Sequence, residues 1–167
     1  MIRIFIDADA CPVKDETYRV AQRYGIQTFV VSNQMIAIPS SPLIERVVVE
    51  QGMDVADNWI ADHVAAHDIV ISGDIPLAAR CVAKGACVLN QRGRILDEDA
   101  IGMALAMRNL MEDLRNAGTI TQGGRSFSKG DRSNFLSALD TAVVRARKTK
   151  TTATMSQRLR AGAGNTP

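Results

Sequence analysis

The 167-residue sequence predicts one α/β domain whose mostly parallel sheet is covered by helices on both faces. Two observations predict this class. Short apolar segments rich in β-branched residues alternate with amphipathic segments through residue 84, as in strand–helix–strand units. Glycine or proline stands at several of the boundaries, where helices commonly begin or end. The length suits a single domain with a buried core, and the sequence contains no internal repeat.

The elements follow from these signals in chain order. Residues 2–7 predict a buried strand, and Pro12 then opens a helix that reaches Tyr24 and ends at Gly25. Residues 33–44 contain two prolines and two serines and predict a loop. The remaining predictions are strands at 28–32, 45–50, 68–72 and 86–90, and helices at 55–66, 76–84, 98–115 and 133–148.

The composition is that of a soluble globular protein, with 46% hydrophobic and 23% charged residues. No apolar run approaches the roughly 20 residues that span a bilayer, and the first residues lack the features of a secretory signal. The three cysteines, Cys11, Cys81 and Cys87, form no CxxC motif and are odd in number, which predicts buried thiols in a reducing compartment. We therefore expect a cytoplasmic protein.

Charge is distributed unevenly along the chain. Residues 1–140 hold all 18 acidic residues and 14 of the 20 basic ones, a net charge of −4, whereas residues 141–167 hold six basic residues and no acid. We predict a folded domain over residues 1–148 and a basic, disordered tail over residues 149–167. Such a tail either contacts a polyanion through its phosphates or is a solvated end of the chain.

Four aspartates are the candidate functional residues. Asp7 and Asp9 follow the first predicted strand, and Asp74 follows the fourth. The carboxyl ends of parallel strands share one edge of the sheet, where open α/β sheets bind their ligands. Asp57 can join them from the first turn of the helix before the fourth strand. Carboxylates this close repel one another unless a cation binds, and hard oxygen ligands suit Mg²⁺ or Mn²⁺.

Three of the four acids also have an ordinary structural interpretation. Asp9 and Asp74 can cap the helices that follow them, and Asp57 can be the third residue of a capping box that begins at Asp54. Asp7 directly continues a buried strand, so a structural role as a helix cap explains it least well. The joint placement of the four acids therefore predicts a metal site more strongly than any one of them does.

Basic residues form the second candidate set. A glycine pair at 123–124 frees the backbone of a glycine-rich loop to approach a ligand closely. Arg125, Lys129 and Arg132 would then contact phosphates from this loop. Lys14 would do the same beside the acids. The alternative interpretation is a solvated connection between two helices.

Other chemistries leave partial signals in the sequence. "DADAC" resembles the nucleophile motif of haloacid-dehalogenase-type phosphatases, but Cys11 replaces the usual Thr or Val and Ala78 replaces a later acid. Cys11 lies near a helix start and could be nucleophilic, although Thr17 stands where a C-x5-R phosphatase loop has arginine. His63 and His67 share a predicted helical face, but no third histidine accompanies them, so a zinc site is not expected.

Three segments carry a resemblance to a known family. They are "FIDADACPVK", "VADNWIADHV" with "IVISGDIPLAARCVAKGA", and "GGRSFSKGDRSNFLSALD". Together they resemble the YaiI/YqxD family of bacterial proteins over about residues 1–148. That family is similar to PIN-like nucleases, particularly the NYN group. The resemblance implies a PIN-like fold with strand order 3-2-1-4-5, in which the first and fourth strands are neighbours.

The resemblance also implies site residues and an activity. Asp7 and Asp9 match the first acidic motif of the NYN-type nucleases. Asp57 matches the second motif and Asp74 the third, and those enzymes bind divalent metal and cut RNA or flap-type nucleic acid. A second acid usually follows the third motif two residues later, where this chain has Pro76. The leading hypothesis is a Mg²⁺- or Mn²⁺-dependent nuclease that acts on RNA, or else on DNA. A non-catalytic RNA-binding module and a small-molecule phosphatase are the alternatives.

Overall fold

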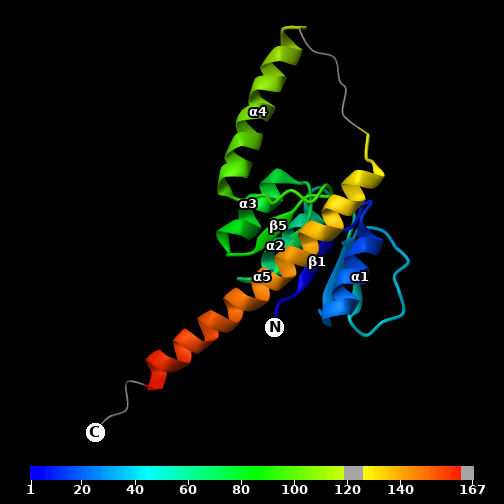
Figure 1. Ribbon diagram of the computed structural model, residues 1–167. Helices are drawn as coiled ribbons and strands as arrows, with labels where there is room; N and C mark the ends of the chain where they lie inside the picture. The colour runs from blue at the N-terminus through cyan, green and yellow to red at the C-terminus, as the bar shows by residue number, and fades with distance from the viewer. Residues whose placement is uncertain (119–125, 163–167) are drawn as a thin grey trace.

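A five-stranded parallel sheet forms the centre of the structure, a computed structural model that describes residues 1–118 and 126–162 (Figure 1). The strand order is β3-β2-β1-β4-β5, and every neighbouring pair is parallel. The predicted α/β class and the implied order are therefore confirmed. The strands are β1 (Ile4–Asp7), β2 (Thr28–Ser32), β3 (Ile44–Val48), β4 (Ile69–Ile71) and β5 (Cys87–Leu89).

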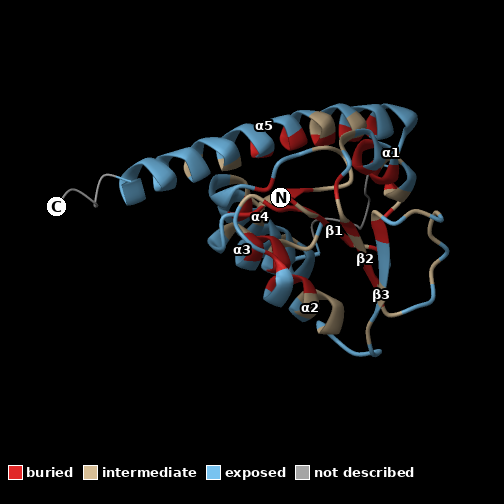
Figure 2. Ribbon diagram, turned by 90° about the horizontal axis from the view of Figure 1, so that it is seen from below, coloured by how far each residue is buried: buried red, intermediate tan, exposed pale blue. Residues whose placement is uncertain are grey.

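The apolar central strand β1 supplies both layers of the core. Successive side chains of a strand point to opposite faces. Ile4 and Ile6 accordingly join the cluster under α1 (Lys14–Tyr24) and α5 (Lys129–Gly162). Phe5 joins the cluster under α2 (Val55–His63) and α3 (Ile75–Ala83). Figure 2 shows the buried residues between the sheet and the helices on its two faces. Helix α4 (Glu98–Asn116) follows β5 along the chain.

The register of the sheet fixes its carboxyl edge. Ile6 pairs with Val30 on one side and with Ile71 on the other. Asp7 pairs with Val31 and is the last residue of β1. Because all five strands are parallel, the residues that follow them lie along the same edge, as the prediction for the acids requires.

The turn after β5 lies directly against α5. Gly93 has a positive φ of 82°, and a Cβ at this position would lie 2.7 Å from the carbonyl oxygen of Asn134. Both the backbone conformation and the close approach therefore require glycine. The contact fixes the turn that carries Gln91, a residue of the carboxyl edge.

Helix α5 begins at a reciprocal cap. The Ser128 N–H donates to Asp131 Oδ2 at 2.9 Å, and the Asp131 N–H donates to Ser128 Oγ at 3.1 Å. This pairing has the form of a capping box with aspartate at its third helical position. It starts the helix at Lys129, four residues before the predicted start at residue 133.

The far end of α5 corrects the sequence prediction. The helix was predicted to end at residue 148 and residues 149–167 to be disordered, but α5 continues to Gly162 (Figure 1). No glycine or proline interrupts residues 131–161, so nothing in the backbone stops the helix. The hydroxyls of Thr149, Thr151, Thr152 and Thr154 each donate to the carbonyl four residues earlier. Residues 163–167 lie outside the described part of the chain.

Helix α4 confirms the helix predicted at 98–115. Asp97 caps it by accepting the Ala100 N–H at 2.8 Å, and Ile101 anchors its first turns in the core. Beyond that anchor the helix is largely exposed and projects away from the sheet (Figure 1). Neither α4 nor any other described helix combines the length and apolar character that crossing a membrane requires.

Candidate acidic site at the carboxyl edge of the sheet

Asp7 is half-buried at the end of β1 and is held by a neighbouring strand. Ser72 directly follows β4, is only 5% exposed, and donates its hydroxyl to Asp7 Oδ2 at 2.9 Å. The same hydroxyl oxygen accepts the Asp74 N–H at 3.1 Å. One serine thus links the ends of β1 and β4 and orients the carboxylate of Asp7.

Asp74 has the capping role that its sequence position indicated. Its Oδ1 accepts the Leu77 N–H at 2.8 Å, and Pro76 lies in the first turn of α3. The cap interpretation is confirmed, and the carboxylate also faces the Asp7 pocket. Capping and ligand binding are compatible because a carboxylate has two oxygens with several acceptor positions.

Asp9 is not a helix cap, which corrects one of the sequence interpretations. Helix α1 begins after Val13 without any side-chain cap. The carboxylate of Asp9 instead accepts the Ser32 hydroxyl and lies 3.2 Å and 3.3 Å from the backbone nitrogen of Asn33. A partner at the end of β2 therefore replaces the local cap, and it holds the exposed Asp9 on the same edge as Asp7.

The capping box predicted at the start of α2 is also wrong. Asp54 adopts a left-handed backbone conformation with φ 63° and makes no side-chain cap. Asp57 is therefore not the partner of a capping residue. It lies in the first turn of α2, half-buried beside the other acids.

Two neighbouring pockets share the Asp7 side chain. The first, of about 310 Å³, is lined by Asp7 and Asp74 together with Ser72 and Gln91. The second, of about 160 Å³, is lined by Asp7, Asp9, Asn33, Asp54 and Asp57. The structure therefore brings all four predicted acids to one edge, with Asp7 between the others.

Burial and the repulsion between neighbouring carboxylates raise the pKa values of two acids at this edge. The pKa of Asp57 is raised to about 6, first because the group is partly buried and then because Asp74 and Asp7 lie nearby. Burial also raises the pKa of Asp7, to which Asp74 and Asp9 add, while the hydrogen bond from Ser72 acts in the opposite direction. Across residues 1–118 and 126–162, no Lys or Arg forms an ion pair with any of the four acids.

The donor chemistry of this edge suits a hard divalent cation, but a complete set of ligands is not assembled. Every candidate donor is a carboxylate, hydroxyl or amide oxygen, the type that Mg²⁺ and Mn²⁺ prefer. As the side chains stand, no group of three or more Asp, Glu, His or Cys residues within the described chain is placed to hold a metal ion. The acids surround the pockets rather than converge on one point.

The predicted basic residues have different surroundings. Lys14 donates to the carbonyls of Cys11 at 2.7 Å and Ala8 at 3.5 Å, and so braces the loop after β1. Arg132 donates to Pro12 O at 2.6 Å, which ties α5 to the same loop. The other two differ: Lys129 is exposed at the start of α5, and Arg125 lies outside the described residues together with the glycine pair.

The surroundings of Cys11, His63 and His67 do not support a nucleophilic cysteine or a zinc site. Cys11 is buried, and burial raises the pKa of its thiol, which is the opposite of what a nucleophile needs. His63 stacks on Trp59 at 3.8 Å and ends α2. His67 lies beyond the helix with a φ of 72°, so the predicted shared helical face does not exist.

Sequence reasoning missed the serines that organise this edge. Ser32 ends β2 and Ser72 follows β4, and both are buried. The sequence signal that could have identified them is a serine at the end of the apolar run of each of these two strands. Gln91, Asn33 and Asp54 were also missed, because their positions depend on how loops from different strands meet.

The fold and this edge define a class: an α/β protein with an open parallel sheet and an acidic pocket at its carboxyl edge. A family model described as "Uncharacterized BCR, YaiI/YqxD family" matches residues 5–145. The chain belongs to this family, which confirms the resemblance that its three motifs carry.

Relatives in several bacteria match most of the chain. A UPF0178 protein of Gluconacetobacter diazotrophicus is 84% identical over 148 residues, 89% of this chain and 96% of the relative. A UPF0178 protein of Gluconobacter oxydans is 57% identical over 146 residues, 87% of this chain and 83% of the relative. One of Caulobacter sp. is 54% identical over 148 residues, 89% of this chain and 98% of the relative. No solved structure gives a significant match.

Proposed function

We propose that the protein is a divalent-metal-dependent nuclease that acts on RNA. The observation that carries the proposal is the set of four aspartates, from separate segments, that line two pockets sharing Asp7. They lack an ionic partner among the described residues. Such a group of acids costs free energy in the absence of a cation, and it gains interactions when one binds.

The similarity of the family to PIN-like nucleases supports the same proposal. Those enzymes place their acids at the end of the first strand and after the fourth, and here these strands are neighbours. Asp7 and Asp74 meet through Ser72 at that point. The strand order that this meeting requires is the one that the family resemblance implies.

The residues of the carboxyl edge and the start of α5 have different roles in the proposed reaction. A bound Mg²⁺ or Mn²⁺ supplies a water of lowered pKa and neutralises charge on the phosphate. Asp7, Asp9, Asp57 and Asp74 would hold one or two such ions from the two pockets that share Asp7. Ser72 orients Asp7 by hydrogen bonding, and Lys129 offers an exposed positive charge to the phosphate backbone at the start of α5. Arg132 braces the loop after β1 through Pro12 O, and its contact with phosphate stays a prediction.

A non-catalytic RNA-binding module is the second candidate. Three observations favour it: the described side chains do not form a ready ligand set, one oxygen of Asp74 is engaged as a cap, and Pro76 stands where the related nucleases usually have an acid. RNA would then be held without being cut. Metal-dependent cleavage separates the two candidates.

The test is a cleavage assay on labelled single-stranded and hairpin RNA. The wild-type protein, Asp7→Asn and Asp62→Asn are purified identically and incubated with Mg²⁺, Mn²⁺ or EDTA. Asp62 is a matched control because it is exposed on α2 and lines neither pocket. We expect cleavage by the wild type and by Asp62→Asn with metal, and loss of at least about 100-fold for Asp7→Asn.

Two results would contradict the proposed activity. If Asp7→Asn cuts as fast as the wild type, the activity belongs to another site or another protein. If the wild type binds RNA in a filter assay but cuts none of the substrates with either metal, the non-catalytic module is the correct function.

A further inference from the structure

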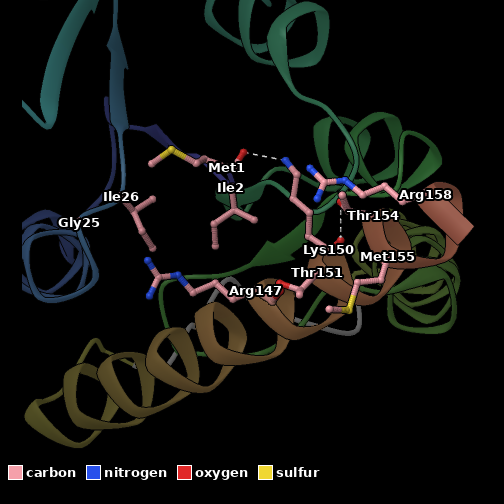
Figure 3. A pocket seen from close by; sticks show the side chains of 10 residues that line it. All are labelled: Met1, Ile2, Gly25, Ile26, Arg147, Lys150, Thr151, Thr154, Met155 and Arg158. Atoms are coloured by element: carbon pink, nitrogen blue, oxygen red, sulfur yellow. Dashed lines mark hydrogen bonds between the residues drawn. The ribbon is translucent and has the colours of Figure 1, made fainter.

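A third pocket lies at the opposite, amino edge of the sheet, away from the four aspartates. Met1 and Ile2 precede β1, Ile26 precedes β2, and one face of α5 closes the space between them (Figure 3). Its volume is about 470 Å³. The face of α5 that takes part carries residues 147, 150, 151, 154, 155 and 158, a spacing that places them along one side of the helix over three turns.

The inner wall of this pocket is apolar. Ile2 is 5% exposed and Ile26 is 1% exposed, and both belong to the core under α1 and α5. Met155 adds a flexible, 62% exposed side chain at the mouth. A ligand that enters can therefore bury an apolar body against the edge of the core.

Three cations surround this apolar wall, and none of the residues lining the pocket is acidic. Arg147 donates to Tyr24 O at 2.6 Å, and Lys150 donates to Met1 O at 2.7 Å. Arg158 makes no hydrogen bond or ion pair with any residue in the described part of the chain. Carbonyl oxygens fix two of these side chains without cancelling their charge, so the pocket keeps a positive field.

Asp68, an acid whose charge acts on the Met1 amino group, does not neutralise these cations. Asp68 is 1% exposed, and its carboxylate is fully engaged by the side chain and backbone of Arg3 and by the Ala65 N–H. The hydroxyls of Thr151 and Thr154 donate to helix carbonyls and are not available as donors. An anion in the pocket would therefore interact with the three cations.

We propose that this pocket binds a small organic anion: a carboxylate, sulfonate or phosphate head attached to an apolar body. The head lies among Arg147, Lys150 and Arg158, and the body packs on Ile2 and Ile26. The outer wall of the pocket lies beyond residues 5–145, which the family model matches. The pocket shares no lining residue with the two acidic pockets, and its test does not involve RNA or metal.

The experiment uses two fluorescent probes with the same rings. 1-Anilinonaphthalene-8-sulfonate carries the anionic head, and N-phenyl-1-naphthylamine lacks it. Each is titrated into the full-length wild type, Arg158→Gln, Arg160→Gln and Thr151→Trp. Arg160→Gln removes the same charge from the same helix but outside the pocket, and Thr151→Trp fills the pocket from an exposed position. Circular dichroism verifies that each variant keeps its helix content.

We expect the sulfonate to bind the wild type with one site and the neutral probe to bind at least about tenfold more weakly. Arg158→Gln and Thr151→Trp should each weaken sulfonate binding about tenfold, and Arg160→Gln should leave it unchanged. Equal affinity for the two probes would overturn the proposal, because the charge would then play no part. Wild-type affinity in both pocket variants would overturn it too, because the probe would be bound elsewhere.

Discussion

The two edges of the sheet carry opposite charges that the protein itself does not neutralise. At the carboxyl edge, burial and the charges of neighbouring acids raise the pKa values of Asp7 and Asp57. At the amino edge, Arg147 and Lys150 line a pocket that contains no acid. The sequence has the same division, with an excess of acids before residue 141 and no acid after it.

The comparison shows how a fold can position charges without cancelling them. Neutral dipoles hold the charged groups at both edges: a hydroxyl on Asp7 and a backbone N–H on Asp74, and carbonyl oxygens on Arg147 and Lys150. Such hydrogen bonds offset part of the cost of desolvating a charge. They leave the net charge in place, so each edge attracts a ligand of the opposite sign.

The largest expected effect concerns a cation at the acidic edge. Mn²⁺ or Mg²⁺ at about 100 times its Kd should raise the free energy of unfolding by about 2.7 kcal/mol, because it binds only the folded state. Differential scanning calorimetry with millimolar metal, and with EDTA as control, measures the shift in Tm. In the double variant Asp7→Asn/Asp74→Asn the shift should disappear. An unshifted wild type, or an equal shift in the double variant, would show that these carboxylates do not hold metal.

The next effect in size tests whether the cations of the amino edge also stabilise the fold. Arg147→Gln should lower the free energy of unfolding by about 1 kcal/mol, since it removes a charged hydrogen bond and a contact with the Tyr24 ring at 5.4 Å. Lys148→Gln, one residue away and outside this pocket, is the matched control. Urea denaturation measures the free energy of unfolding of both variants. Equal stability of the two variants would mean that Arg147 does not anchor α5.

A smaller effect is the pH dependence caused by Asp57. The pKa of this group is about 6 in the folded protein and near 3.9 in an unfolded chain. Between about pH 4 and pH 6 the folded state therefore binds more protons, so the contribution of Asp57 to stability falls as the pH rises. Asp57→Asn should be more stable than the wild type at pH 7.5, and this difference should shrink toward pH 4.

Urea denaturation at several pH values without metal measures this dependence, with Asp62→Asn as the control on the same helix. A difference between Asp57→Asn and the wild type that stays constant from pH 4 to pH 7.5 would mean that Asp57 does not titrate in this range. Because a bound cation favours the ionised form, adding metal should reduce the advantage of Asp57→Asn at pH 7.5.

Local and periodic signals predicted the sheet and the placement of the four aspartates along its carboxyl edge. The apolar strands, the cap at Asp74 and the alternation of strands with helices are properties of short segments, and these predictions hold. The cap predicted for Asp9 failed because Ser32, which is distant in sequence, competes for the same carboxylate. The capping box at Asp54 failed because that residue adopts a left-handed conformation. The first failure comes from a tertiary contact and the second from a backbone conformation, and the short-range pattern of residue types contains neither.

The tail prediction failed for a different reason. A low content of large apolar residues indicated disorder after residue 148, but the absence of glycine and proline up to residue 161 also permits a continuous helix. Lys150 of this part of α5 donates a hydrogen bond to Met1 O, a contact that composition alone does not reveal. The amino-edge pocket exists because of this extension.

The smallest expected effect separates binding from folding at the amino edge. Arg158→Gln should change the free energy of unfolding by less than about 0.5 kcal/mol, because Arg158 is exposed and has no hydrogen-bond or ion-pair partner among the described residues. Arg147 is expected to act on stability, and Arg158 only on the anion. Urea denaturation of Arg158→Gln beside Arg160→Gln measures the difference. A loss above 1 kcal/mol would make Arg158 an anchor of α5, and weakened probe binding in that variant would then report a displaced helix instead of a missing charge.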